Sequence, residues 1–459
     1  MQRHQDPQLA SAERADDEKT IRDEQPGQEF SEKKDMEAAK PSSSIGPASV
    51  HEETDVDLED DDFPDGGLKA WSVVAGSSFG TFATFGFVNA WGVFQAYYEQ
   101  TLLSTTPPST IAWIGSIQYA LVFIPGLVIG RLFDMGIYKM PIFLASVMLV
   151  VCTILVAQCK EYWQFLLCQG IAVGLACGVI FGPTLGAVAH WFKRKKGLAL
   201  GVVAVGSSGG GTLFPIAARN LILRVGFPWT MRILAFIIMA ALAVTNLTIE
   251  RRLPPKKNSG PFINLAAFRS PAYSMYCSAG FITFLGLYTV LTYIDVSAAF
   301  VGVDENFSFY LVSIANAASA IGRIGAGILA DKFGALNVMI PATTVAGIIT
   351  YIWPFVTNKG GYVGIAIVYG ISSGVFVSML AAPLIEMGDR QTVGVRLGMF
   401  FTILAMGALA GPPISGAINT ATGDFKAVGY YAGSAVMISV LQLILTRQFI
   451  IGRCLRGKI

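Results

Sequence analysis

Residues Ser313–Gly334 read Ser-Ile-Ala-Asn-Ala-Ala-Ser-Ala-Ile-Gly-Arg-Ile-Gly-Ala-Gly-Ile-Leu-Ala-Asp-Lys-Phe-Gly. The run is small and apolar for most of its length, contains one arginine, Arg323, and ends at Asp331-Lys332. Its length and apolar character predict a membrane-spanning helix. An ionised side chain at membrane depth costs about 2.5–3.5 kcal/mol on insertion scales, so it usually faces a protein interior or a wet cavity. Arg323 is therefore the leading candidate for a functional residue.

Two polar residues share a helix face with this arginine. Asn316, Ser319 and Arg323 stand at i, i+3 and i+7, which is the spacing of one side of a helix. The functional interpretation is that this polar face lines a path for a solute. The alternative is that Arg323 snorkels to the membrane interface or pairs with a neighbouring carbonyl group.

Bulk composition assigns the chain to the membrane class. Of the 459 residues, 53% are hydrophobic and 14% are charged, and a soluble core cannot absorb that much apolar surface. The six cysteines have no paired spacing and the three histidines are scattered, so no disulfide framework, metal site or cofactor is expected. The sequence contains no nucleotide-binding segment and no cluster of catalytic residue types. A primary pump and an enzyme are both disfavoured.

Charge divides the chain into two parts. Residues 1–65 hold 20 of the 31 acidic residues and 7 of the 33 basic ones, so the other 394 residues carry 11 acids and 26 bases, or +15. The first 62 residues have almost no aromatic or branched apolar side chains, which predicts a disordered acidic tail in the cytosol. Its end, Glu52–Asp62, is either a binding segment for a cytosolic partner or a solvated run of charge. No cleavable signal peptide is expected, because no charged-then-apolar start precedes it.

From Ala70 onward, apolar runs long enough to cross about 30 Å of hydrocarbon recur along the chain. The expected fold is an all-α membrane protein with twelve transmembrane helices in two six-helix, pseudo-symmetric halves. The expected spans are Ala70–Ala96, Ile111–Arg131, Met140–Ala157, Trp163–Ala189, Gly197–Arg219, Trp229–Ile249, Pro271–Val301, Phe307–Ala330, Ala335–Val356, Gly361–Ile385, Val395–Ile418 and Val428–Ile450.

Basic residues indicate the orientation of these spans. They cluster after the even-numbered spans, most densely at 193–196 and 251–257, whereas the alternate loops are sparse or mixed. By the positive-inside bias, both termini are expected in the cytosol. Arg219 and Arg224, after the fifth span, are the exception. The expected location is the plasma membrane, with a vacuolar membrane as the alternative.

An internal repeat supports two halves. Gly130-Arg-Leu-Phe-Asp-Met-Gly136 matches Gly327-Ile-Leu-Ala-Asp-Lys-Phe-Gly334, with an offset of 197 residues between the two aspartates. Parallel halves are one of the arrangements that transporters use for alternating access. The expected domains are the acidic tail over 1–65, a first half over 66–250, a cytosolic linker over 251–269 and a second half with a short basic tail over 270–459.

Several motif-like stretches accompany this repeat. Pro64-Asp-Gly-Gly-Leu-Lys-Ala-Trp71 leads into the first span, and Trp191-Phe-Lys-Arg-Lys-Lys-Gly-Leu-Ala-Leu-Gly201 runs into Gly206-Ser-Ser-Gly-Gly-Gly211. Span eleven carries Gly411-Pro-Pro-Ile-Ser-Gly416. With the Arg323 segment and twelve spans in two halves, these stretches resemble the major facilitator superfamily and, within it, the monocarboxylate porter family, particularly its fungal branch. The resemblance implies the major facilitator fold and a transport function, and it specifies no substrate.

Two positions depart from the animal lactate–proton members of that family. In those members the first span carries a lysine, and the eighth span carries an aspartate four residues before the arginine. Counting forward from Trp71 puts Asn89 at the lysine position, and counting back from Arg323 puts Ser319 at the aspartate position. This chain therefore has the arginine of those members but lacks the titratable lysine and aspartate that accompany it. This difference argues against lactate–proton symport by the same residues.

The candidate substrate site is centred on Arg323. Its guanidinium offers a planar fork of donors and stays charged, which suits an anionic or strongly electronegative group of the substrate. Asn89, Asn316 and Ser319 would add neutral hydrogen bonds.

Span seven contributes a further polar face. Tyr288, Thr292 and Asp295 stand at i, i+4 and i+7. Tyr288 and Thr292 join the predicted substrate site. Asp295, a carboxylate in the outer part of the span, is the candidate proton carrier or partner of the arginine. The alternative is that Asp295 caps or hydrogen-bonds within a water-accessible outer vestibule.

Four further residues are candidates for gating. Asp134 and Asp331 stand at the starts of cytosolic loops, where a carboxylate can face a helix N-terminus or an arginine and be released when a gate opens. Arg390 and Arg396, near the start of span eleven, are their candidate partners.

The predicted function is secondary active transport of a small organic solute, an organic anion or monocarboxylate-like compound, by alternating access. The first alternative is efflux of a secondary metabolite. The second comes from another class of protein, a transporter-like nutrient sensor that signals through its N-terminal tail. The expected partners are a small-molecule substrate, the lipid bilayer and protons, with no nucleic acid.

Overall fold

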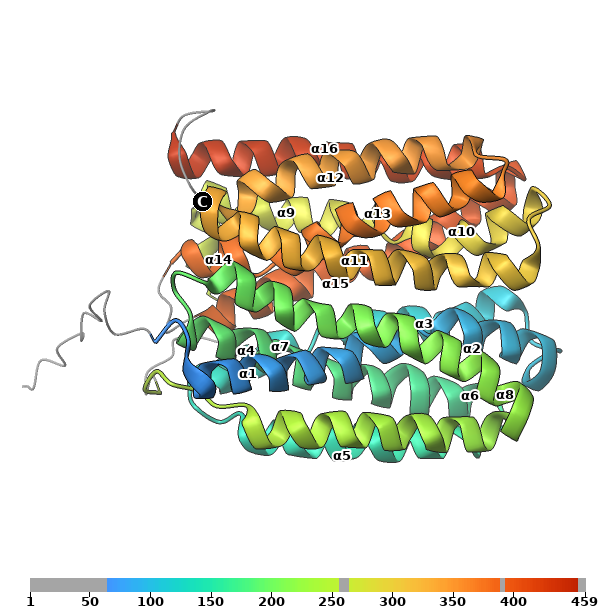
Figure 1. Cartoon of the computed structure of the whole chain (residues 1–459), viewed down its shortest axis with the longest axis horizontal. Helices are drawn as coiled ribbons and strands as arrows, with labels where there is room; N and C mark the ends of the chain where they lie inside the picture. The colour runs from blue at the N-terminus through green and yellow to red at the C-terminus, as the bar shows by residue number, and fades with distance from the viewer. Residues whose placement is uncertain (1–63, 256–263, 389–392, 453–459) are drawn as a thin grey trace, which may run out of the picture. The chain divides into compact units, whose positions relative to one another are not determined.

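The computed structural model of the chain describes residues 64–255, 264–388 and 393–452, and all regular structure in these ranges is helical. Nearly all of the acidic tail, part of the expected linker and Arg390 lie outside the described residues. The long helices run side by side from one end of the bundle to the other (Figure 1). We call the end at which α1 (Gly67–Thr81) begins the tail-side end, and the opposite end the far end.

The N-terminal group of helices runs from α1 to α8. The helices that follow α1 are α2 (Trp91–Tyr97), α3 (Pro108–Leu121), α4 (Gly126–Asp134), α5 (Lys139–Val156), α6 (Tyr162–Phe165), α7 (Gly174–Trp191) and α8 (Lys196–Thr248). π-Helical turns extend three of them, at Phe82–Gly86 (η2), Tyr98–Leu102 (η3) and Leu166–Val173 (η4). Gly226 interrupts α8 with φ 76°, a conformation that glycine adopts without steric cost. Thus α8 contains two consecutive membrane segments.

The C-terminal group runs from α9 to α16. Its bounds are α9 (Pro271–Gly286), α10 (Thr289–Phe300), α11 (Glu305–Phe333), α12 (Ala335–Ile352), α13 (Lys359–Met379), α14 (Ala382–Glu386), α15 (Val393–Thr422) and α16 (Phe425–Ile451). Side-chain caps begin three of these helices. Asp304, Asn358 and Asp424 each accept a hydrogen bond from a backbone N–H group in the first turn of α11, α13 and α16.

Each expected span coincides with a helical segment of the described residues. Ten helices or helix pairs there are long and apolar enough to cross a membrane. The break at Gly226 divides one of them in two, and α1, η2 and α2 cover the first expected span, Ala70–Ala96. The fifth span was expected to end at Arg219, but the helix continues to Val225, because the turn residue is Gly226 and not the charged residues before it. The all-α membrane fold is confirmed.

Tyrosine hydroxyl groups satisfy carbonyl groups where helices break. Tyr276 donates to the carbonyl oxygen of Leu380, between α13 and α14, at 2.9 Å. Tyr369 donates to that of Leu287, between α9 and α10. A broken helix leaves backbone groups without their partners, and neighbouring helices must supply new ones in lipid. The breaks are thus stable parts of the fold.

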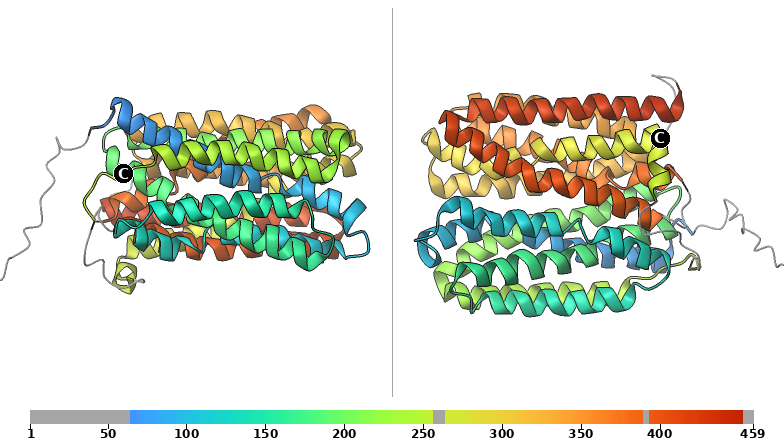
Figure 2. Two further views of the ribbon diagram at one scale, coloured as in Figure 1. Left: turned by 90° about the horizontal axis from the view of Figure 1, so that it is seen from below. Right: turned by 180° about the vertical axis from the view of Figure 1, so that it is seen from behind.

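The two groups of helices meet along two helix pairs, α4 with α15 and α8 with α11 (Figures 1 and 2). A Cβ atom on Gly130 would overlap the carbonyl group of Gly394, and one on Gly197 would lie 2.6 Å from the carbonyl oxygen of Gly327. Gly130 and Gly327 are 197 residues apart, and so are Gly197 and Gly394. The same close backbone contact is therefore made once by each pair, as pseudo-symmetric halves require.

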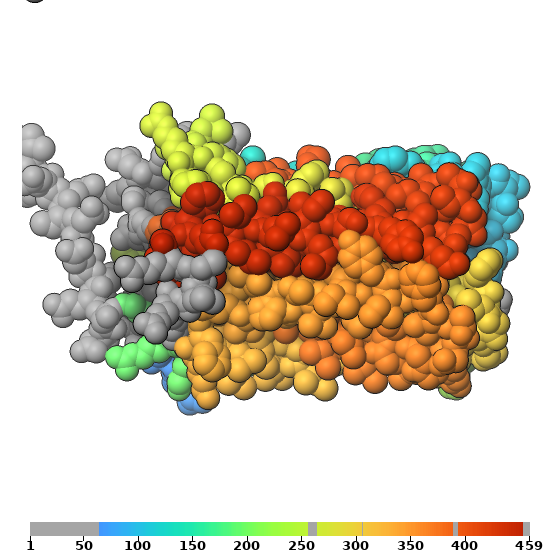
Figure 3. All heavy atoms as spheres, turned by 90° about the horizontal axis from the view of Figure 1, so that it is seen from above, coloured from blue at the N-terminus to red at the C-terminus, as the bar shows by residue number. Residues whose placement is uncertain are grey.

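The outer surface of the bundle is apolar. Figure 3 shows α16 lying beside α12 along one face. On that helix Ile438, Leu441 and Phe449 are 48%, 62% and 51% exposed. Soluble monomers rarely expose contiguous apolar surface of this kind, whereas lipid covers it without cost.

The glycine contacts predict a position-specific effect on stability. Gly130→Ala should lower the thermal stability of the protein in detergent by the equivalent of about 1–3 kcal/mol, because a new methyl group must push α4 and α15 apart. Gly325→Ala is the matched control, since a Cβ atom there meets no other atom within 4 Å. Equal melting temperatures for the two variants would contradict the close contact between the halves.

Candidate functional site

Arg323 lies at the junction of the two groups of helices. It projects from α11, is 6% exposed, and donates through Nη1 to the carbonyl oxygen of Ala204 and to the hydroxyl group of Ser207, both in α8. Its buried Nε has no hydrogen-bond acceptor, and no carboxylate among the described residues forms an ion pair with it. A buried charge without a counter-ion is costly, so this guanidinium has unused capacity to bind an anion.

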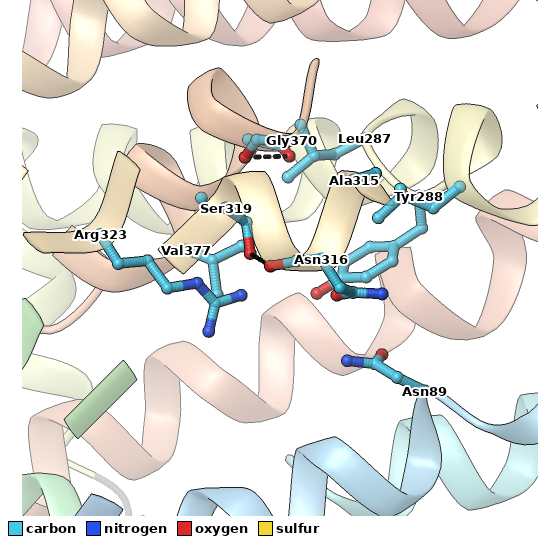
Figure 4. Close-up of a pocket in the computed structure, with 12 residues that line it drawn as sticks. Asn89, Leu287, Tyr288, Ala315, Asn316, Ser319, Arg323, Gly370 and Val377 are labelled. Carbon is cyan, nitrogen blue, oxygen red and sulfur yellow. Dashed lines mark hydrogen bonds between the residues drawn. The ribbon is translucent and has the colours of Figure 1, made fainter. Parts of the chain in front are cut away.

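A small polar cavity adjoins this arginine. Figure 4 shows Arg323, Ser319 and Asn316 on α11, with Asn89 approaching from the N-terminal group and Tyr288 beside them. These are five of the six predicted substrate-site residues, and all five line the cavity. Its volume is about 20 Å³, enough for roughly one water molecule. The remainder of the lining is Leu287, Leu291, Ala315, Gly370, Ser373, Gly374 and Val377.

Hydrogen bonds hold the polar face of α11 against α8. The hydroxyl groups of Ser319 and Ser208 are 2.6 Å apart, so the two groups of helices are bonded directly at this level. A Cβ atom on Gly211 would lie 2.9 Å from the side-chain amides of both Asn316 and Asn89. This glycine of the fifth span therefore makes room for the two asparagines to face each other.

Two predicted residues lie outside this cavity. The hydroxyl group of Thr292 donates to the carbonyl oxygen of Tyr288 at 2.8 Å, and the carboxylate of Asp295 accepts the Val296 N–H at 2.8 Å. They share a helix face with Tyr288, but a helix rises 1.5 Å per residue, which carries them about 6 Å and 10 Å further along α10. The structure therefore gathers Tyr288 into the cavity and leaves the other two nearer the far end.

A second cavity, of about 40 Å³, lies on the other side of Arg323. Arg323, Tyr288 and Val377 line both cavities, so they divide one site into two compartments. We call the second one the aromatic compartment, because six aromatic rings contribute to its lining, namely those of Phe85, Phe123, Phe181, Phe284, Phe401 and Tyr288.

Phe123 is the centre of this ring cluster. Its ring centroid is 5.4 Å from that of Phe85, 5.6 Å from Phe284 and 5.8 Å from Phe401, so it joins rings of both groups of helices. No pattern in the sequence predicts this compartment. A phenylalanine in a membrane span looks like ordinary apolar filling, and no spacing rule marks the ones that converge.

Pseudo-symmetry makes the two sides of the site chemically different. The counterpart of Arg323 at the 197-residue offset is Gly126, and the counterpart of Ala204 is Phe401. Arg323 bonds to Ala204 on one side, whereas on the other the space beside Gly126 is occupied by Phe401, 3.8 Å from the position of a Cβ atom there. The same frame thus offers a cation on one side and an aromatic ring on the other.

Two aspartates close the tail-side end. The carboxylate of Asp134 accepts the N–H groups of Gly394 and Val395, at 3.1 and 3.0 Å, at the N-terminus of α15. The carboxylate of Asp331 accepts those of Gly197 and Leu198, at 2.6 and 2.9 Å, at the N-terminus of α8. Carboxylates are stabilised at helix N-termini by the helix dipole. We call these two contacts together the tail-side gate.

Two arginines, Arg390 and Arg396, are predicted beside this gate. Nε of Arg396 donates to the carbonyl oxygen of Leu384 at 3.3 Å, while Arg390 lies outside the described residues. An ion pair between Lys196 and Glu386, at 2.7 Å, adds a further contact between the two groups of helices at this end.

The far end is also bridged. Nη2 of Arg219 donates to the side-chain oxygen of Asn306 at 2.9 Å, and its guanidinium lies 4.4 Å from the ring centroid of Phe309. Arg219 was an unexplained exception to the charge bias, and this contact between α8 and α11 accounts for it. Since both ends are bridged and the cavities hold only a few water molecules, a larger solute can reach Arg323 only after one end opens.

Known proteins are similar to this chain in sequence or in fold. The family profile described as "Major Facilitator Superfamily" matches residues 78–386. The chain is 37% identical over 400 residues to the "MFS-type transporter 1" of an Ophiocordyceps species, covering 86% of this chain and 89% of that protein. It is 36% identical over 382 residues to the "Aspyridones efflux protein apdF" of Emericella nidulans, covering 83% and 78%. It is 36% identical over 385 residues to the "Fujikurins efflux protein" of Gibberella fujikuroi, covering 82% of each chain.

Solved structures agree on the fold. The human organic anion transporter MFSD10 superposes with a TM-score of 0.64 at 14% identity, covering 82% of this chain and 98% of that one. The fucose:proton symporter of E. coli superposes with a TM-score of 0.59 at 15% identity and the same coverage. At such low identity the likeness concerns the fold alone.

The gate contacts predict unequal contributions to stability. Asp134→Ala leaves the amides of Gly394 and Val395 without acceptors in a buried setting, at about 1–3 kcal/mol each. Glu386→Gln removes the charge of an acid that is 41% exposed but keeps an amide oxygen that the buried Lys196 can still bind, so the expected loss is about 1 kcal/mol or less. Thermal unfolding in detergent should therefore show a clear drop for the first variant and a small one for the second. The reverse order would contradict the assignment of Asp134 to the gate.

Proposed function

This chain belongs to the Major Facilitator Superfamily, and we propose that it is a secondary active transporter that exports an amphipathic organic anion by alternating access. It is a multi-pass membrane transporter and not an enzyme. The sequence alone favoured a monocarboxylate-like solute, with efflux of a secondary metabolite as the alternative. Relatives named for the efflux of aspyridones and of fujikurins favour the alternative.

The observation that carries this proposal is the buried guanidinium of Arg323. It lies between the two groups of helices, lines both cavities and has no described carboxylate beside it. A substrate carboxylate, enolate or similar anion would supply the missing counter-ion and bind its planar fork of donors. Asn89, Asn316 and Ser319 would then add hydrogen bonds that fix the orientation of the anion.

The aromatic compartment supports a substrate larger than a short-chain acid. Rings stack favourably on other rings and on extended apolar groups, and each buried ring contributes strongly to binding. A solute with an anionic end and a flat or branched apolar body would match the cation on one side of the site and Phe123 and Phe401 on the other. A small hydrophilic acid would leave these rings unused.

The finer family assignment is also part of the proposal. We assign the chain to the monocarboxylate porters on the Pro64–Trp71 and Trp191–Gly201 stretches and on Arg323. The lysine and aspartate of the lactate–proton members are replaced by Asn89 and Ser319. If transport is coupled to protons, the carboxylate for this role would be Asp295, which lies outside the polar cavity.

The topology of the proposal follows the basic residues. The tail-side end would face the cytosol, with both termini there and the chain in the plasma membrane. The halves would be 66–250 and 270–459, joined by the linker 251–269. Asp134 and Asp331 would release their helix N-termini when the cytosolic side opens to load the substrate, while Arg390 and Arg396 would act beside them. The acidic tail would be available to a cytosolic partner.

Removing the charge of Arg323 tests the binding site. Untargeted metabolite profiling of cells and medium should reveal a compound that accumulates outside only with the wild-type protein, compared with a null strain. Arg323→Gln should weaken apparent affinity for that compound about tenfold or more, because charge-assisted hydrogen bonds are lost. Arg232→Gln is the control, since Arg232 faces the Trp229 ring outside both cavities.

Two outcomes would contradict the proposal. Unchanged export by Arg323→Gln at equal membrane abundance would remove the arginine from the substrate site. Depletion of a medium component that depends on the wild-type protein would mean uptake in place of export.

The aromatic compartment gives a prediction about selectivity. Phe123→Ala should weaken the apparent affinity for an acid with a large aromatic body about tenfold and leave that for a short aliphatic acid unchanged, because only the former contacts the rings. Phe236→Ala, at an exposed outer position, is the control. Competition assays with a graded series of acids would measure this. An equal loss for both kinds of acid would mean that Phe123 serves the fold and not selectivity.

A further inference from the structure

One carboxylate at the tail-side end binds three consecutive backbone amides. Oδ1 of Asp65 accepts the N–H groups of Lys193, Arg194 and Lys195, at 2.8, 2.8 and 3.2 Å. The N–H group of Asp65 donates in return to the carbonyl oxygen of Trp191 at 3.3 Å. Asp65 adopts φ 44°, a left-handed conformation that aspartate tolerates better than most residues but that still costs free energy. The bonds to the segment between α7 and α8 compensate for this cost.

These amides immediately precede the ones that form part of the tail-side gate. Gly197 and Leu198 donate to the carboxylate of Asp331, so two carboxylates together bind five of the six N–H groups over residues 193–198. Asp65 belongs to the same group of helices as this segment, whereas Asp331 belongs to the opposite group. Of these two carboxylates, only Asp331 must give up its bonds to the segment when the groups separate at this end.

Other contacts fix the region around Asp65. The ring centroids of Trp71 and Phe192 are 5.3 Å apart, and the indole N–H of Trp191 donates to the carbonyl oxygen of Glu250 at 2.9 Å. Lys69 pairs with the carboxylate of Glu250 at 3.1 Å. The start of α1 and Glu250, just after α8, thus lie against the 191–195 segment. Among these contacts, only the Asp65 bonds join a side-chain oxygen to the backbone N–H groups of residues 193–195 in the described chain.

We propose that Asp65 is a positioning residue of the tail-side gate: it holds the segment before α8 so that the amides of Gly197 and Leu198 stay directed at Asp331. This inference rests on the proposed alternating access. When the gate is open, Asp65 keeps the first turn of α8 in place, and Asp331 can bind again without the segment having to refold. Without Asp65 the amides lose their fixed direction, and the closed form of the gate is less populated.

Accessibility of a buried position to a thiol reagent tests this proposal. Ala381 is 2% exposed and lines the aromatic compartment, so Ala381→Cys in a cysteine-free background reports opening of the site. Asp65→Ala should raise its rate of labelling by an impermeant reagent on the tail side about tenfold, because charge-assisted bonds to three amides are lost. Labelling from the far side should not rise. A general loss of structure would raise labelling from both sides.

Three further variants make the test specific. Asp65→Asn keeps an acceptor oxygen without charge and should raise labelling only about twofold to threefold. Asp304→Ala removes the N-cap of α11, which lies at the far end of the bundle, and should leave tail-side labelling unchanged. In an Asp331→Ala background, Asp65→Ala should add little, because Asp65 acts by directing the amides of Gly197 and Leu198 at the carboxylate that this background lacks. Additive effects would mean that Asp65 acts independently of the gate and would overturn the proposal.

The proposal can be overturned even if one variant fails to insert into the membrane. Wild-type labelling rates for Asp65→Ala would overturn the proposal, and if that variant fails to insert, wild-type rates for Asp65→Asn would do so. Labelling requires no substrate. A protein that exports none of the compounds tested but shows the expected labelling would count against the proposed function alone. Unchanged labelling with intact export would count against the role of Asp65 alone.

Discussion

The site depends on a buried cation that the protein leaves without a counter-ion. Arg323 is held between the two groups of helices by a carbonyl oxygen and a hydroxyl group of α8. Neutral acceptors keep the guanidinium in place without neutralising it. The cost of this burial is tolerable because the charge lies at a protein junction and not in lipid. The same junction brings Asn89 and Asn316 together and separates a polar cavity from an aromatic one. An anion with an apolar body is the solute that uses all three features.

The helix contacts around this charge occur twice, once in each pseudo-symmetric half. Glycine contacts and aspartate caps recur at an offset of 197 residues, at Gly130 and Asp134 and again at Gly327 and Asp331. The two halves differ at Arg323, which stands opposite Gly126 in this register, and the proposed substrate site lies at this difference. The contacts of the tail-side gate are symmetric, whereas the residues that line the polar cavity are not. In the proposed transport cycle, the symmetric contacts would serve the motion of the halves, and the asymmetric residues would serve recognition.

The membrane fold and much of the candidate site could be predicted from the sequence, because burying a charge or a polar group in a membrane span is costly. A charge inside an apolar run must face protein or water, which singled out Arg323, and helical spacing then added Asn316 and Ser319. The repeated aspartates pointed to helix N-termini, where the structure has them. Other features leave no such trace. The rings around Phe123 resemble any apolar residues of a span, Thr292 and Asp295 share a face with Tyr288 but lie beyond the cavity, and the bonds of Asp65 join residues more than 120 positions apart.

The central claim is that the unpaired charge of Arg323 recognises an anion that also carries an apolar body. The most direct measurement is calorimetric titration of the purified protein with an aromatic carboxylic acid and with its neutral amide, which match in shape and differ in charge. We expect the wild-type protein to bind the acid at least about tenfold more tightly than the amide, and Arg323→Gln to lose that preference. Equal binding of acid and amide by the wild-type protein would contradict the account.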